Sequence, residues 1–470
     1  MKIKIFYLGT CILLIVSCIF LNSLYSTTQI KRVHQHQTDT SLPVVRINTN
    51  GQEIPGAPKE QVNSEGISYL STSSVDSTEE IIANISFEDG ESTIVSDTRL
   101  HYRGNSSRYF DKKSYSVKLV NSDGTKNAQK LFGMSKHNDW VLNGPFLDRS
   151  LMRNYLCYNI AGEIMSYSPN VRYCELYVNE EYQGLYLLVE TVSQGIGRIN
   201  LTKTEKNKPY TSFIVNWDRT EKTKLSLDNF TAYTMKSSFS SLSVRYPGTL
   251  NLTEDKFNYI STQISDLEKI LYSSSLFYED TYSSILDMNE FAEYFVINEF
   301  FRNADAGFYS TYLYKDLREK IKPVVWDFNN CCDNFIHDEF DESGFSLTDA
   351  PWFNQLLKDK EFVTLVIETY RVLREQYLSE EYLMNYIDDV DTWLGDSITK
   401  NDMVWGYVYD TEKIDEYNYL LPKERNVTSH EEAVEQLKDY ITRRGNWLDN
   451  NIEILYQYCS DSKNTNHFVR

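Results

Sequence analysis

The chain has 470 residues, 41% of them hydrophobic and 35 of them tyrosines, so it can bury a large core in one or two domains. Its formal net charge at pH 7 is −20. Binding to a nucleic-acid backbone needs basic patches, so this charge argues against a nucleic-acid partner, although it selects no other ligand.

The first 25 residues have the pattern of a membrane-directed segment. After a basic start, residues 5–21 are mostly apolar and uncharged, close to the ~20 residues that a spanning helix needs, and no convincing cleavage site follows. We therefore expect residues 1–25 to be a transmembrane anchor, with the bulk of the chain outside the cytoplasm. A cleaved signal segment or a lipoprotein acylated at Cys18 is the alternative. Residues 26–41 are polar and have the character of a linker.

Alternation of apolar and polar residues next predicts antiparallel strands on either side of one helix. The strands are expected at Val44–Asn48, Ile81–Glu88, Thr98–Arg103, Tyr115–Val120, Arg172–Val178 and Gly184–Glu190, and the helix at Asp148–Met165. Residues 200–250 are rich in Ser, Thr and Lys and are interpreted as an irregular insertion.

Helical spacing dominates the remainder of the chain. It predicts helices at Thr253–Tyr272, Asn289–Phe300, Pro351–Gln376, Ser379–Ile398 and Ser429–Tyr456. The fold class expected from this order is α+β, with a mainly antiparallel sheet followed by a helix-rich C-terminal half.

Cysteine usage gives no clear site. Five cysteines lie beyond the apolar segment and none forms a CxxC pair, which makes a zinc site improbable. The vicinal pair Cys331-Cys332 is interpreted as small buried side chains rather than as a redox or metal feature.

Two carboxylates flank a predicted hairpin. Asp305 precedes the strand-like stretch Ser310–Tyr314, and Asp327 follows the stretch Lys320–Trp326. A hairpin returns its two ends to one side of a sheet, so the two acids are expected to lie near each other. Kinases use two acids in such an arrangement, one for the substrate hydroxyl and one for the metal on the phosphates.

Six sequence blocks, in order, resemble those of the CotH (spore coat protein H) family of atypical protein kinases. They are Arg103–Ser107 with Lys112–Leu119, Asn138–Asn143, Asp148–Asn154, Tyr182–Glu190, Asn303–Asp305 with Ser310–Lys315, and Trp326–Asn329. The similarity covers a kinase-like core at residues 42–335, and residues 336–470 are expected to be a helical C-terminal part of the same domain.

The resemblance implies an extracytoplasmic or spore-coat-associated kinase that binds ATP and Mg²⁺ (or Mn²⁺) and phosphorylates Ser/Thr hydroxyls of a protein. It casts Asp305 as the catalytic acid and Asp327 as the metal-binding acid. The remaining implied roles are Lys118 for phosphate binding with Lys113 as its rival, Asn329 or Asn330 for the metal shell, Glu190 for the lysine or the nucleotide, and Arg103 for phosphate.

Some features depart from the kinase pattern. No GxGxxG loop is present, so Gly104–Arg108 is expected to cover the nucleotide instead. Asp333 is either an extra metal ligand or a cap of the following turn. A non-catalytic surface or coat-assembly module built on the same fold stays open as an alternative, and a glycan hydrolase using the two acids is a weaker one.

Overall fold

The computed structural model describes residues 41–72, 79–219, 223–234, 240–273, 282–336, 338–415 and 418–461. The expected membrane segment at residues 1–25 lies outside these ranges, as does all of the linker except Ser41. Within the described ranges, no helix has both the length and the apolar character needed to cross a membrane.

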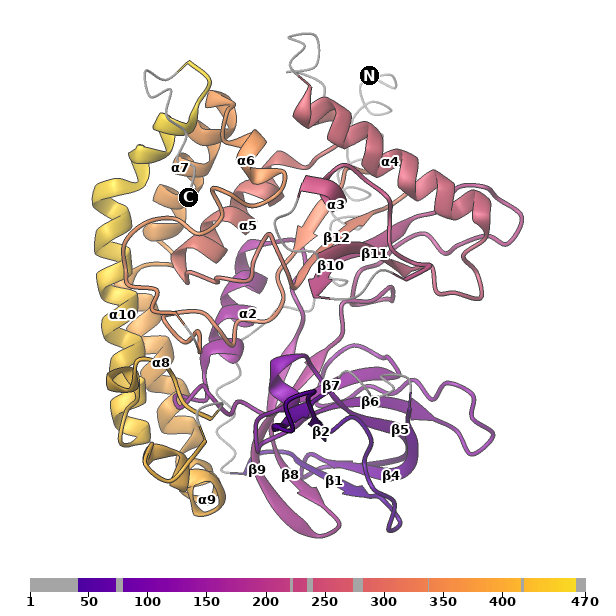
Figure 1. Cartoon of the computed structure of the whole chain (residues 1–470), viewed down its shortest axis with the longest axis vertical. Helices are drawn as coiled ribbons and strands as arrows, with labels where there is room; N and C mark the ends of the chain where they lie inside the picture. Colours follow the sequence, from indigo (N-terminus) through magenta and orange to yellow (C-terminus); the bar gives the residue numbers. More distant parts are fainter. Residues whose placement is uncertain are drawn as a thin grey trace, which may run out of the picture.

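Seven strands close into a barrel in the order β1-β4-β5-β6-β7-β9-β8, in the lower part of Figure 1. They are β1 (Val44–Asn48), β4 (Ile81–Glu88), β5 (Thr93–Arg103), β6 (Ser114–Val120), β7 (Asp139–Asn143), β8 (Val171–Val178) and β9 (Glu181–Glu190). Neighbours are antiparallel except β1 and β8, whose parallel pairing closes the barrel. Leu100, Val117 and Leu142 point into the barrel and form part of its buried apolar interior. Because side chains alternate along a strand, the residues next to them in sequence face outward.

The second sheet has four antiparallel strands in the order β11-β10-β12-β13. These are β10 (Phe213–Arg219), β11 (Ser240–Tyr246), β12 (Thr311–Lys315) and β13 (Lys322–Val324). The interpretation of residues 200–250 as an irregular insertion is therefore wrong. The region supplies β10, β11 and the short helix α3 (Thr231–Thr234), because the apolar start of β10 is buried on both faces and β11 pairs with it despite its serines.

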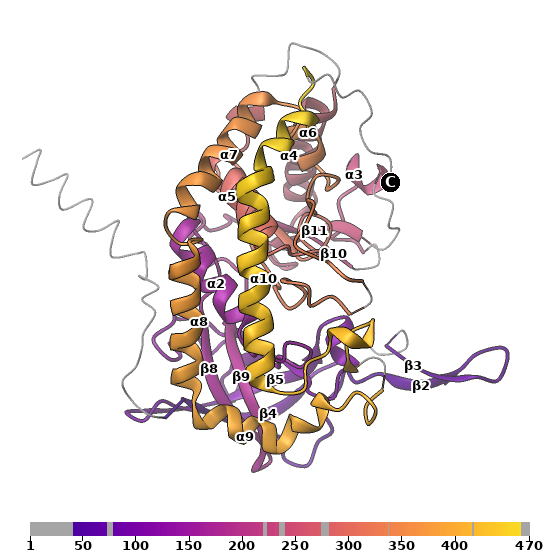
Figure 2. The ribbon, with the colours of Figure 1, turned by 90° about the vertical axis from the view of Figure 1, so that its left-hand side faces the viewer.

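Helices surround this sheet and one side of the barrel (Figures 1 and 2). They are α2 (Arg153–Ile164), α4 (Glu254–Tyr272), α5 (Met288–Phe300), α6 (Phe353–Leu356), α7 (Lys360–Arg374), α8 (Glu380–Leu394), α9 (Asp396–Trp405) and α10 (His430–Asn451). A two-stranded hairpin, β2 (Lys59–Val62) with β3 (Ser68–Ser71), projects from the body in Figure 2.

Two of the long predicted helices are broken. Asp359 caps the start of α7 by accepting from the backbone N–H of Glu361, which separates α6 from α7. Gly395, at φ +41°, ends α8 and begins α9. The α+β class is confirmed, since strands dominate up to residue 246 and helices dominate after it.

The barrel and the helices are joined through α9. Gly184 of β9 has φ +95°, and a Cβ there would lie 2.7 Å from Oδ1 of Asn401, so only glycine fits. The same Asn401 oxygen accepts from the backbone N–H of Leu185 at 3.1 Å and from the buried Lys112 amine at 2.8 Å. This contact fixes the orientation of the barrel against the helical half.

Candidate active site

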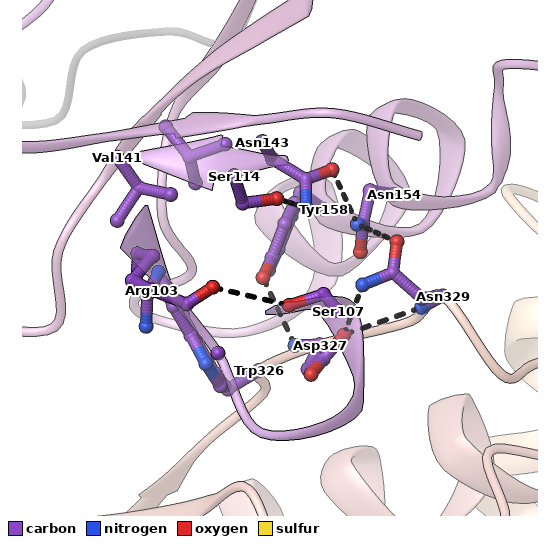
Figure 3. Close-up of a pocket in the computed structure, with 12 residues that line it drawn as sticks. Arg103, Ser107, Ser114, Val141, Asn143, Asn154, Tyr158, Trp326, Asp327 and Asn329 are labelled. Atoms are coloured by element: carbon purple, nitrogen blue, oxygen red, sulfur yellow. Dashed lines mark hydrogen bonds between the residues drawn. The ribbon is translucent and has the colours of Figure 1, made fainter. Parts of the chain in front are cut away.

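A polar cleft lies between the outer face of the barrel and the loops at the two ends of the β12–β13 hairpin. Five of the predicted site residues line it: Arg103, Asp305, Asp327, Asn329 and Asn330. Figure 3 shows its inner end, where side chains from the barrel, α2 and the segment after β13 converge. Both acids at the ends of the β12–β13 hairpin thus line one cleft, as the sequence predicts.

Asp327 has an unusual backbone, with φ +60°, in the left-handed region that non-glycine residues rarely adopt. Its backbone N–H donates to the Tyr158 hydroxyl at 2.9 Å, and its Oδ1 accepts from Nδ2 of Asn329 at 2.6 Å. Burial, reinforced by the charge of Asp305, raises the pKa of Asp327 to about 6, while Arg103 opposes the shift. The carboxylate is therefore held in position at a cost that a cation would relieve.

The first turn of α2 positions this segment. Asn154 accepts from the backbone N–H of Phe328 at 2.8 Å. Its Nδ2 donates to Oδ1 of Asn329 at 2.7 Å, as Figure 3 shows. Asn329 consequently links Asn154 to Asp327. In this arrangement it orients the acid, and its role as a metal ligand stays a prediction.

A buried ion pair anchors the next turn. Arg153 donates to Asp148 at 2.7 Å, and both side chains are at most 3% exposed. The same guanidinium donates to the carbonyl oxygens of Cys331 at 3.0 Å and Cys332 at 3.2 Å. The Asp148–Asn154 block thus holds the segment after Asp327 through hydrogen bonds from Arg153 and Asn154.

The cysteine side chains are packed as expected. Cys331 and Cys332 are buried, and the sulfur of Cys331 lies 3.7 Å from that of Cys157. Within the described part of the chain, no group of three or more His, Cys, Asp or Glu side chains could hold a metal. Asp333 acts in the turn, where its Oδ1 accepts from the backbone of Phe340 at 2.7 Å and from Arg425 at 2.8 Å.

Asp305 is held on both carboxylate oxygens. Its Oδ1 accepts from Arg219 at 2.6 Å, and its Oδ2 accepts from Nδ2 of Asn330 at 2.8 Å. Burial raises the pKa of Asp305, and the charge of Arg219 opposes that shift. Asn330, predicted for the metal shell, contacts this second acid in the structure. The preceding Asn303 donates to the carbonyl of Asp327 at 3.2 Å and so ties the two acidic segments together.

Lys118 lies on the same outer face of the barrel as Arg103. Lys118 lies opposite Arg99 on the neighbouring strand, and Arg99 and Arg103 are four residues apart on β5. Lys118 and Arg103 therefore point to the same face of the sheet. The Lys118 amine lies 2.5 Å from Oε1 of Glu80, and it is not among the described residues that line the cleft.

The other two predicted nucleotide ligands lie outside the cleft lining as described. The Lys113 amine donates to the carbonyl oxygen of Arg108 at 2.8 Å, so it folds back onto its own loop. Glu190 is fully buried and accepts from Ser135 and from Asn170, at 2.5 and 3.0 Å. Neither side chain pairs with Lys118 in the structure.

The segment Gly104–Arg108 lines the cleft opposite Asp327. Gly104 has φ +106°, and a Cβ there would lie 1.8 Å from the Ser107 hydroxyl, which donates to the Arg103 carbonyl. The Arg103 guanidinium lies 5.6 Å from the centre of the Trp326 ring. The placement is compatible with the expected cover over a nucleotide, which stays a prediction.

Sequence reasoning missed two charged partners. Glu80 pairs with Lys118, and Arg219 pairs with Asp305. Arg219 ends a strand in the region interpreted as irregular, and Glu80 directly precedes β4, so no local pattern marks either residue.

Comparison with known proteins gives a consistent result. A family model described as "CotH kinase protein" matches residues 100–448, which is more than half of the chain. The chain is also similar to the inner spore coat protein H of Bacillus subtilis (strain 168), with 22% identity over 299 residues, covering 62% of this chain and 74% of the relative. The matched residues extend past Phe335 into α10.

Proposed function

Because the chain belongs to the CotH family, we propose that it is an ATP-dependent protein kinase with a kinase-like fold, acting on Ser or Thr hydroxyls of a protein. The observation that carries the proposal is the meeting of Asp305, Asp327 and Arg103 in one cleft. Two separated carboxylates and the guanidinium of Arg103 suit phosphoryl transfer, which depends on positioning and charge neutralisation.

The proposed reaction is the following. The acceptor hydroxyl oxygen bonds to the γ-phosphorus of ATP while the bond from that phosphorus to the β–γ bridging oxygen breaks, and ADP leaves with the electron pair. The hydroxyl proton passes to Asp305, whose carboxylate is fixed by Arg219 and Asn330.

The residues around Asp327 fit a Mg²⁺ or Mn²⁺ ion. Such ions need one or two protein carboxylates and take their remaining ligands from phosphate and water, so a cluster of three acids is not required. Asp327 would hold the ion, with Asn329 as a second ligand after rotation of its amide. When bound, the ion offsets phosphate charge. Arg103, which lines the cleft, is the proposed phosphate contact, and Lys118 stays a candidate whose amine is paired with Glu80 outside the described cleft lining.

A place in or near the spore coat is proposed from the name of the Bacillus subtilis relative. The apolar residues 5–21 support a site outside the cytoplasm, reached through a membrane anchor. In that setting the substrate would be a protein of the coat or cell surface.

Two measurements test the function. Thermal melting should shift upward with ATP and Mg²⁺ together, since a ligand that binds the folded state stabilises it. Labelled phosphate from ATP should then appear on Ser or Thr of a candidate acceptor. Asp305→Asn should keep the thermal shift and lose the transfer, whereas Asp388→Asn, at an exposed carboxylate of α8 paired with Lys438, should change neither. A chain that shows no thermal shift and no transfer would instead favour the coat-assembly module.

A further inference from the structure

One arginine holds the carboxylate proposed to receive the acceptor proton. Arg219 is the last residue of β10, and its Nη2 donates to Oδ1 of Asp305 at 2.6 Å. The Asp305 side chain is 7% exposed and that of Arg219 is 32% exposed. The acid is therefore nearly buried, the guanidinium is more exposed, and both side chains line the cleft.

The position of this guanidinium is fixed by its surroundings. It lies over the ring of Tyr309, 4.1 Å from the ring centre. The backbone N–H of Tyr309 in turn donates to the Asp305 carbonyl at 2.8 Å, and the backbone N–H of Arg219 donates to Asp218 at 2.8 Å. The ring, the acid and the end of β10 thus hold the arginine before any ligand arrives, as a preorganised site requires.

Arg219 also lines the cleft in which the proposed transfer would take place. The cleft described by the structure is lined by three arginines, Arg103 and Arg108 from the barrel side and Arg219 from the second sheet. Of the three, Arg219 is the one paired with Asp305. A guanidinium has five N–H donors in a planar fork, so one contact to a carboxylate leaves further donors for another anion.

We propose that Arg219 is a further catalytic residue, whose guanidinium bridges Asp305 and the phosphoryl group in transfer. The proposal rests on the function proposed above. The bonds that form and break are those already given, and Arg219 stays protonated throughout. Its free N–H groups donate to the phosphoryl oxygens, where charge is spread in the transition state, while its contact with Asp305 keeps the acid aligned with the acceptor.

A purely structural role for Arg219, as a counter-ion for a buried acid, predicts a different outcome. It would require only a positive charge near Asp305, so a lysine would serve as well as an arginine. A bridging role also needs the planar fork, and a lysine would restore the activity only in part.

The first experiment compares Arg219→Gln and Arg219→Lys with Arg245→Gln. Arg245 lies on the neighbouring strand β11, 3.7 Å from Asp218, and is not among the described residues lining the cleft, so it is the matched control. We expect Arg219→Gln to lower the turnover number about 100-fold. KM for ATP and for the acceptor should change little, Arg219→Lys should recover part of the loss, and Arg245→Gln should behave as the wild type.

A second readout does not depend on turnover. ADP with Mg²⁺ and aluminium fluoride imitates the transferring phosphoryl group, so the wild type should bind it more tightly than ADP with Mg²⁺. Arg219→Gln should lose most of that gain while its affinity for ADP is preserved, which also shows that the variant is folded.

The outcomes separate the two proposals. Transfer at the wild-type rate by folded Arg219→Gln would overturn the role of Arg219 and leave the kinase assignment standing, as would full recovery by Arg219→Lys. A large rise in KM for ATP would make Arg219 a nucleotide-binding residue instead. Failure of the wild type to bind ATP or to transfer phosphate would overturn both proposals.

Discussion

At the scale of single residues, Asp327 combines a strained backbone with an unfavourable charge. We expect Asp327→Asn to abolish the Mg²⁺-dependent part of ATP binding, because the formal charge in the proposed metal shell is lost. The same change should raise the melting temperature of the ligand-free protein by about 1–2 °C, since asparagine tolerates positive φ and carries no charge to bury. Melting curves with and without ATP and Mg²⁺ test both effects. A variant that melts lower in both states would show that Asp327 stabilises the fold instead.

The pKa of Asp327 gives this effect a pH dependence. The pKa rises from 3.8 to about 6 on folding, so the folded chain binds the proton more tightly than the unfolded chain. Ionisation of this carboxyl therefore lowers the stability of the folded protein as the pH rises from about 4 to 6, and the destabilisation is complete above pH 6. The difference in melting temperature between Asp327→Asn and the wild type should be largest near pH 7.5 and shrink toward about pH 4.5. A difference that does not vary with pH would assign the whole effect to the backbone.

At the scale of elements, the first turn of α2 carries the Asp327 segment. Replacing Arg153 with methionine leaves Asp148 as an uncompensated buried charge and releases two carbonyl oxygens after Asn330. We expect Arg153→Met to lower the free energy of unfolding by about 3–5 kcal/mol, measured by denaturant titration. The control is Arg371→Met, which removes an exposed ion pair with Glu453 and should cost about 1 kcal/mol or less. Equal losses in the two variants would contradict the anchoring role.

The sequence predicts those strands in which apolar and polar residues alternate regularly. The strands at Val44–Asn48 and Ile81–Glu88 have the predicted bounds, because one face of each is buried in the barrel and the alternation is regular. β11 escapes prediction because its serines resemble a loop, and only its pairing with β10 makes it a strand. Asp359 and Gly395 are capping residues at the two helix breaks. The apolar spacing continues past both positions, so it predicts one helix where the structure has two.

In the candidate site, too, contacts between residues close in the sequence are predictable and contacts between distant residues are not. The juxtaposition of Asp305 and Asp327 follows from the local hairpin that joins them, so it is predictable. The pairs Arg219–Asp305 and Lys118–Glu80 join residues far apart in the chain, and their formation depends on how the two sheets pack. No periodicity in one sequence encodes such a contact.

At the scale of the whole molecule, α10 is part of the core and not an appendage. Arg444 is fully buried and donates to the carbonyl oxygens of Glu299, Glu342 and Gly344, at 2.7 to 3.0 Å. We expect a chain that ends after Asn426 to be insoluble or to lack a cooperative melting transition, because the Glu299 carboxylate loses its buried partner. A chain that ends after Asp461 keeps the described contacts and should melt like the full chain. Cooperative melting of the shorter chain would show that the remainder folds alone.

The parallel pairing of β1 with β8 has a consequence for the order in which the chain matures on the ribosome. Val44 lies opposite Glu175, so β1 has only β4 as a partner until β8 has been synthesised. Because β9 joins β8 to β7, the barrel can close once Glu190 has been made, when Asp305 and the Asp327 segment are still unmade and the buried Arg444 follows later still. A nascent chain therefore completes its barrel well before it has a cleft, and the proposed activity arises only near the end of synthesis.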